Sequence, residues 1–142
     1  ELKVGLGEFD AAIAAHEEAL RLQTEIAAQN ADNESHRALT LLHLGRIERQ
    51  RGNGGAAVAH LSEAISAMDA LVTAYADVPV YREDLIDALE AMGDTLAEPG
   101  RARPHFLRAV ALIDGFAENG ELAPAYAQRR EALIAKANPG AD

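Results

Sequence analysis

Apolar residues recur every three or four positions along most of the chain, which is the spacing of one face of an α-helix. The pattern is clear in Leu85, Leu89 and Met92, and again in Leu61 and Met68. Glycine, proline and Asp/Asn residues interrupt it at intervals typical of turns. We therefore predict helices over residues 8–29, 34–51, 54–75, 79–97, 103–117 and 121–137.

The helical pattern repeats at an interval of 45 residues. The stretch "LGEFDAAIAAHEEAL" from Leu6 matches "RGNGGAAVAHLSEAI" from Arg51, and a third copy ends in "FLRAVALI". The interval widens to 48 residues between Leu44-Gly45 and Met92-Gly93, and a three-residue loss further on restores it. Residues that match at the 45-residue interval are Gly7 and Gly52, Ala12 and Ala57, and Ala19 and Ala64. Tandem copies of one helix pair indicate a repeat architecture.

This pattern resembles the tetratricopeptide repeat, on the residues Leu41, Leu44-Gly45, Gly52-Asn53, Ala57 and Ala64. The resemblance implies an all-α fold, a right-handed superhelix of antiparallel helix pairs. Small residues at Gly45 and Gly93 would let paired helices approach closely, because a larger side chain there would overpack the contact. The glycines Gly7, Gly52 and Gly100 suit left-handed helix C-caps.

The repeat divides one domain, residues 1–142, into successive parts. We expect a half unit at 1–30, units at 31–75 and 76–118, a capping helix at 119–137 and a flexible tail at 138–142. The capping helix has an apolar face with Leu122, Tyr126 and Leu133, and we expect its charged residues Arg129, Arg130, Glu131 and Lys136 to face water. The first unit has no such cap, so Ile13 and Leu20 would need cover from preceding repeats or from another chain.

Composition restricts the function. Thirty-one alanines and only six aromatic residues favour closely packed helices, and 23 acidic against 13 basic residues give a net charge of −10. That charge repels nucleic acid and anionic membranes, so we expect neither as a partner. The chain has no apolar run of the roughly 20 residues that span a bilayer, and we expect a cytoplasmic protein.

Patterns for catalysis or cofactor binding are weak. The glycine-rich "RGNGGAAVAH" has no Lys-Ser/Thr pair and follows a helix, so it predicts a turn between helices more strongly than a phosphate loop. The five histidines lack the His-x-x-x-His spacing of a helical metal site, and no serine has an obvious His and acid partner. We therefore expect a noncatalytic chain without cofactor or metal.

One charged cluster stands out. Asp87, Glu90, Asp94 and Glu98, the acidic stripe, recur at helical spacing away from the apolar face of the same helix. By the geometry of the family, this stripe and the matching face of the preceding unit would line a concave groove for a basic or mixed-charge peptide or helix. The candidate groove residues are Leu42, His43, Arg46, Arg49, Asp87, Glu90, Asp94 and Glu98. Alternatively, Arg46 pairs with Glu90 or Asp94 inside the protein.

The sequence therefore predicts a scaffold for protein interaction. Two alternatives stay open. The connector "AYADVPVYREDLIDALEAMGD" looks like repeat arrays that follow the kinase domain in some bacterial serine/threonine protein kinases, which implies a regulatory region. The uncapped first helix implies a self-assembly module.

Overall fold

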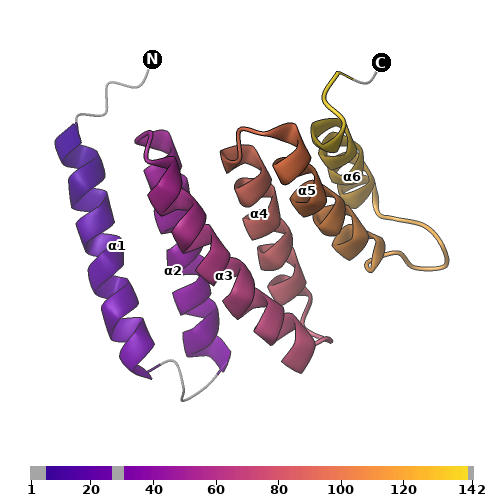
Figure 1. The fold of residues 1–142 in the computed structure, drawn as a ribbon. Coiled ribbons are helices and arrows are strands. Elements are labelled where there is room, and N and C mark those ends of the chain that lie inside the picture. The colour runs from indigo at the N-terminus through magenta and orange to yellow at the C-terminus, as the bar shows by residue number, and fades with distance from the viewer. Residues whose placement is uncertain (1–5, 27–30, 141–142) are drawn as a thin grey trace.

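The computed structural model describes residues 6–26 and 31–140, and these form helices joined by short turns (Figure 1). The helices are α1 (Leu6–Ile26), α2 (Ala31–Gln50), α3 (Gly54–Ala74), α4 (Pro79–Thr95), α5 (Pro99–Asp114) and α6 (Pro124–Ala137). The described residues contain no β-strand beyond one isolated bridge. The predicted all-helical fold is confirmed, although several helix ends differ from the prediction.

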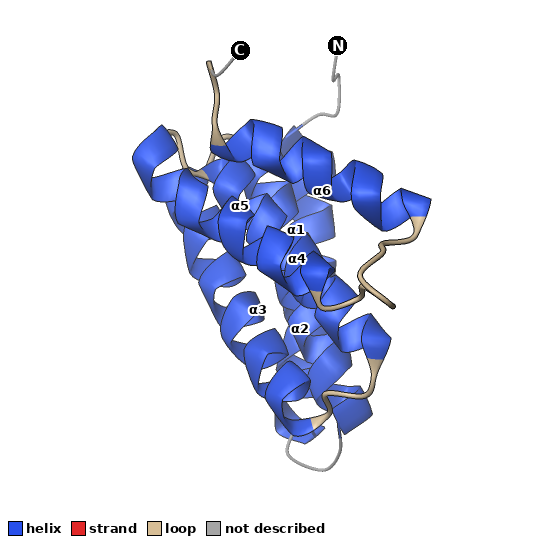
Figure 2. Cartoon of the chain, turned by 90° about the vertical axis from the view of Figure 1, so that its right-hand side faces the viewer, coloured by secondary structure: helices blue, strands red, loops and turns tan. Residues whose placement is uncertain are grey.

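The helices follow one another in chain order as an antiparallel array (Figure 1). Each helix packs against the next one, and α2 also contacts α4 directly. Viewed from the side, the array forms one continuous stack in which α6 crosses over its end (Figure 2). Neighbours along the chain are therefore neighbours in space, as expected when successive apolar faces cover one another.

The core runs through the middle of this array. Its largest fully buried side chains are Leu41, Leu42, Leu44, Leu61, Met68, Leu85, Ile86, Leu89, Ile113 and Leu133. They come mainly from the apolar stripes that the sequence predicts, because a helix buries the face on which its apolar residues recur.

Two glycines let neighbouring helices pack closely, as predicted. A Cβ added to Gly45 of α2 would lie 2.5 Å from Cγ of Leu61 on α3. A Cβ on Gly93 of α4 would lie 2.5 Å from the ring of Phe106 on α5. Both distances are too short for real atoms, so these helix pairs pack at their observed separation only because the side chain is missing.

The turn between α2 and α3 is a Schellman motif. Gly52 has a φ of 87°, its N–H donates to the carbonyl of Arg49, and the N–H of Asn53 donates to the carbonyl of Glu48. The Asn53 side chain then accepts from the N–H of Ala56 and caps α3. The predicted left-handed C-cap at Gly52 is confirmed, and the glycine-rich stretch is a turn between helices.

The predicted C-caps at Gly7 and Gly100 are wrong, because both glycines lie in the first turns of helices and neither has a positive φ. The helix expected to start at residue 103 starts at Pro99. Proline suits this first position, since the N–H it lacks has no partner there and its φ is already helical.

The link from α5 to α6, residues 115–123, contains a tight turn that the sequence analysis missed. The N–H groups of Glu118 and Glu121 each donate to the other residue's carbonyl. Between them, Asn119 and Gly120 have φ of 52° and 79°, the conformation for which Asn-Gly is the preferred pair. This turn delays α6 to Pro124, three residues after its predicted start.

Residues 1–5, 27–30 and 141–142 lie outside the description, and with them lie the two ends of the predicted half unit 1–30 and the end of the predicted tail. In the described part of that tail, Asn138 caps α6 by donating from its side chain to the carbonyl of Ile134. No helix in the described ranges is both long and apolar enough to cross a membrane.

Candidate functional site

Most of the acidic stripe is in contact with α6. Arg129 of α6 lies 2.6 Å from Asp87 and 3.0 Å from Glu90 on α4. Lys136 lies 2.8 Å from Glu90 and 3.0 Å from Asp94. The two cations thus bridge three carboxylates in one row, with Glu90 shared between them.

The spacing of these pairs shows that α4 and α6 run in the same direction. Arg129 and Lys136 are seven residues apart, as are their partners Asp87 and Asp94. Seven residues are about two helical turns, so both cations project from one side of α6. The cations on α6 and the carboxylates on α4 have the same spacing along helices that run the same way, so both pairs form at once.

The charges in this row shift one another's pKa values. Burial opposes ionisation of Glu90, but hydrogen bonds from Lys136 and Arg129 outweigh burial and hold its pKa below the ordinary value. Burial likewise opposes the charge on Lys136, and its bonds to Glu90 and Asp94 outweigh that effect and raise its pKa. Glu90 and Lys136 therefore both stay charged near neutral pH.

On the other side of the acidic stripe lies α2. Arg49 of α2 is 3.6 Å from Asp94, whereas Arg46 makes no ion pair to any described residue. The alternative in which Arg46 pairs with the stripe is not what the described residues show: the carboxylates pair with Arg49 of α2 and with Arg129 and Lys136 of α6. Charged side chains from α2, α4 and α6 form a continuous row, the charged face: Arg46, Arg49, Asp87, Glu90, Asp94, Arg129 and Lys136.

Two predicted groove residues on α2 differ in their exposure. Leu42 is only 1% exposed and belongs to the core, so it offers no surface to a partner. His43 lies at the surface, where its ring meets the edge of His16 on α1 at 5.9 Å between centroids. Partial burial, and then the nearby His16 and Arg46, lower the pKa of His43 and favour its neutral form.

Glu98 does not share the helix of the other three carboxylates. Because α4 ends at Thr95, Glu98 lies in the turn and is the N-cap residue of α5, where its backbone carbonyl accepts from Arg101 and Ala102. The predicted stripe is therefore one residue shorter on α4, and Glu98 is an exposed neighbour of it.

The start of α4 adds carboxylates that the sequence analysis did not single out. Glu83 accepts a hydrogen bond of 2.6 Å from the Tyr126 hydroxyl of α6. Asp84 is partly buried with no hydrogen bond or ion pair to a described residue, and burial together with Asp87 and Glu83 raises its pKa to about 6. The α6 contact thus extends along α4 from Glu83 to Asp94.

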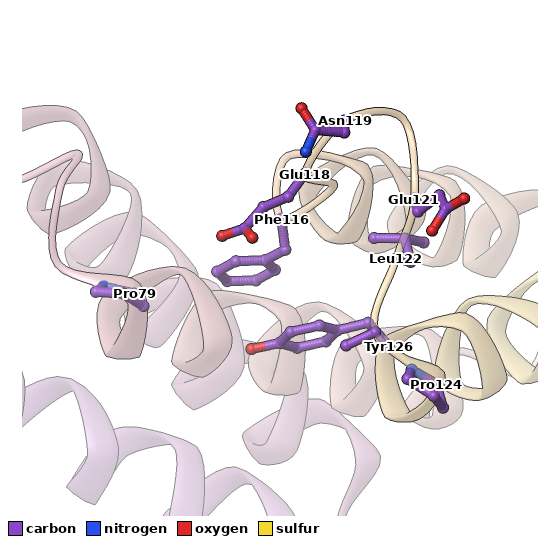
Figure 3. Close-up of a pocket in the computed structure, with 9 residues that line it drawn as sticks. Pro79, Phe116, Glu118, Asn119, Glu121, Leu122, Pro124 and Tyr126 are labelled. Carbon is purple, nitrogen blue, oxygen red and sulfur yellow. The ribbon is translucent and has the colours of Figure 1, made fainter.

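Beside this contact lies an open pocket of about 640 Å³, which is lined mainly by residues of the α5–α6 link (Figure 3). The Phe116 and Tyr126 rings stack at 4.6 Å between centroids. Arg82 lies 5.5 Å from the centre of the Phe116 ring. These stacked rings anchor the first turn of α6 to the end of α5.

One buried carboxylate lies outside the charged face. Glu48 of α2 is 5% exposed, its Oε2 has no hydrogen-bond partner among the described residues, and its Oε1 is 3.8 Å from Arg51. The described ranges contain no group of three or more His, Cys, Asp or Glu side chains placed to hold a metal ion.

The residues that the sequence analysis missed as site residues are Arg129 and Lys136, which it assigned to the solvent side of the capping helix. Their signal was present: two cations seven positions apart match two carboxylates seven positions apart. Spacing within one helix cannot show which other helix lies opposite, so the pairing becomes visible only in the fold.

The first helix differs from its prediction in one respect. Ile13, expected to need outside cover, is 6% exposed because α1 packs on α2. Leu22 of α1 remains 48% exposed, and self-association through α1 stays a prediction.

Comparisons of the chain with protein-family models, with curated proteins and with solved structures find no match.

Proposed function

We propose that the chain is a noncatalytic protein-interaction module of the tetratricopeptide type, which binds a basic or mixed-charge segment of another protein along its charged face. This proposal includes the arrangement of the helix pairs as the right-handed superhelix of that family. Its basis is the 45-residue repeat, the glycines at the helix contacts and the chain-order packing of antiparallel helices.

The observation that carries the proposal is the contact between α4 and α6. The carboxylates Asp87, Glu90 and Asp94 hold a basic helix of the same chain through matched pairs. A surface that accepts Arg129 and Lys136 within the molecule has the charge and spacing to accept similar cations from a partner. The net charge of −10 adds long-range attraction for a basic segment.

The α2 side of the charged face can pair with acidic residues of a partner. Arg46 has no ion pair to a described residue, and it lies one turn from Arg49, which reaches Asp94. A partner carrying both lysine and glutamate can therefore pair with α4 and α2 at once. Such charge pairs determine orientation and partner choice more than they add affinity.

The experiment is a selection of displayed 16-residue peptides on the full chain, followed by affinity measurement by fluorescence anisotropy. We expect enriched peptides to be rich in Lys and Arg, and Asp87→Lys with Asp94→Lys to weaken their binding at least tenfold. Glu8→Lys with Asp77→Lys is the matched control, because it changes the charge equally at exposed residues with no ion pair to a described residue. Equal binding to both variants would overturn the proposal.

A further inference from the structure

The last helix is held to the array differently from the others. α6 buries two residues, Leu133 and Ala137, whereas α4 buries eight. Its other contacts include the partly buried Tyr126 and Ile134, which pack against the core, and charged pairs whose side chains keep 24–40% of their surface in water. Water and salt screen such pairs, so α6 is attached more weakly than the inner helices.

The surface beneath α6 has the layout of a helix-binding groove. Leu133 is fully buried in the core cluster that contains Phe106 and Ile113, and Lys136 lies 5.8 Å from the centre of the Phe106 ring. Beside this apolar centre runs the row of carboxylates on α4. An apolar centre with an acidic rim suits a basic amphipathic helix, which presents one apolar anchor between cations.

The spacing of the carboxylates matches cations placed two turns apart on a helix. Asp87 and Asp94 are about 10 Å apart along α4, because seven residues rise by about 1.5 Å each. Two cations seven residues apart in an extended peptide would be separated by about 23 Å and could not reach both. A helix beside α4 with cations seven residues apart reaches both carboxylates, as Arg129 and Lys136 do.

We propose that α6 is an exchangeable occupant of a site for basic amphipathic helices, and that a partner helix binds by replacing it. The partner carries an aromatic residue, an arginine, a leucine and a lysine at the relative positions of Tyr126, Arg129, Leu133 and Lys136. This inference rests on the proposed function and specifies its ligand. In the free protein, α6 occupies the site, so a partner helix must compete with α6 to bind there.

The test uses the full chain and a fluorescein-labelled peptide of its own residues 121–139, "ELAPAYAQRREALIAKANP". We expect weak binding to the unmodified chain and at least tenfold tighter binding to the variant R129E/K136E. The apparent dissociation constant falls because reversing both charges releases α6 and increases the open fraction. A peptide carrying the same two reversals should bind neither chain.

The matched control is R101E/R103E, which changes the charge equally at exposed positions of α5 that make no ion pair to a described residue. It should bind the peptide as the unmodified chain does. If R129E/K136E proves unfolded by circular dichroism, R129Q/K136Q replaces it, with an intermediate increase expected.

The proposal is overturned if a folded variant binds the peptide no more tightly than the unmodified chain. It is also overturned in its choice of partner if sedimentation shows dimers of the unmodified chain that R129E/K136E dissolves, because the occupant is then α6 of a second copy. Failure of the peptide selection would count against the proposed function alone, since this exchange assay uses no foreign partner.

Discussion

At the scale of single residues, a missing side chain sets the distance between helices. Gly45 and Gly93 occupy equivalent positions in successive units, and each faces a large side chain of the next helix, Leu61 or Phe106. The two glycines, 48 residues apart, therefore make the same kind of helix contact in successive units. Small residues recur there because both helix pairs close in the same way.

Gly45→Ala should destabilise the protein by about 1–3 kcal/mol, because the new methyl group would overlap Leu61 and force the α2–α3 contact apart. Urea unfolding measures the change. Gly55→Ala is the control: nothing lies within 4 Å of its added Cβ, so it should be neutral or stabilising by up to about 1 kcal/mol. Equal losses for the two variants would contradict the steric explanation.

Asp84 gives a pH dependence with a defined sign. Its pKa is about 6 in the folded protein against 3.8 as the ordinary value, so the folded state keeps a proton that the unfolded state releases. Its contribution to stability is present below pH 3.8 and is lost as the pH rises through 6.

Asp84→Asn should therefore stabilise the protein at pH 7.5 by about 1–2 kcal/mol, a value reduced for the partial exposure of the carboxyl group. The gain should vanish below pH 3.8. Urea unfolding across this pH range measures it, with Asp77→Asn in the exposed α3–α4 turn as the control. A gain that does not depend on pH would show that another property of Asn is responsible.

At the scale of elements, the direction and register of helices decide which charges meet. α2, α4 and α6 are alternate helices of an antiparallel array, so they run the same way, and Arg49, Asp94 and Lys136 meet along one row. The intervening α3 and α5 supply the apolar contacts that keep this spacing. The charged face is thus a consequence of repeating one helix pair with little change in length.

Helix boundaries follow local chemistry that periodicity alone does not reveal. α5 starts four residues before its predicted start because Pro99 suits the first position of a helix. α6 starts late because Asn119-Gly120 forms a tight turn of its own. In both cases the residues at the boundary indicate where the helix starts, whereas the apolar pattern starts at another position.

At the scale of the whole molecule, a stack in chain order distributes stability unevenly. Ile13 is the buried apolar residue of the described part of α1, whereas α3 buries six residues and α4 buries eight. Each helix is stabilised mainly by its immediate neighbours, so the ends of such an array open more easily than its middle.

We expect amide hydrogen exchange to be at least tenfold faster in α1 than in α3, because α1 packs on one neighbour and α3 on two. Mass spectrometry of peptides from the exchanged full chain measures the difference. Equal protection of α1 and α3 would show that the array unfolds as a single cooperative unit.

The sequence by itself determined the helical class, the repeat and the roles of Gly45, Gly52 and Gly93, because periodicity and backbone freedom are local properties. It also placed Asp87, Glu90 and Asp94 on one side of one helix. Only the tertiary structure decided that Leu42 lies in the core and that Arg129 and Lys136 pair with the stripe. These outcomes depend on which helix lies opposite, and residues about 40 positions apart become neighbours only when the whole array is packed.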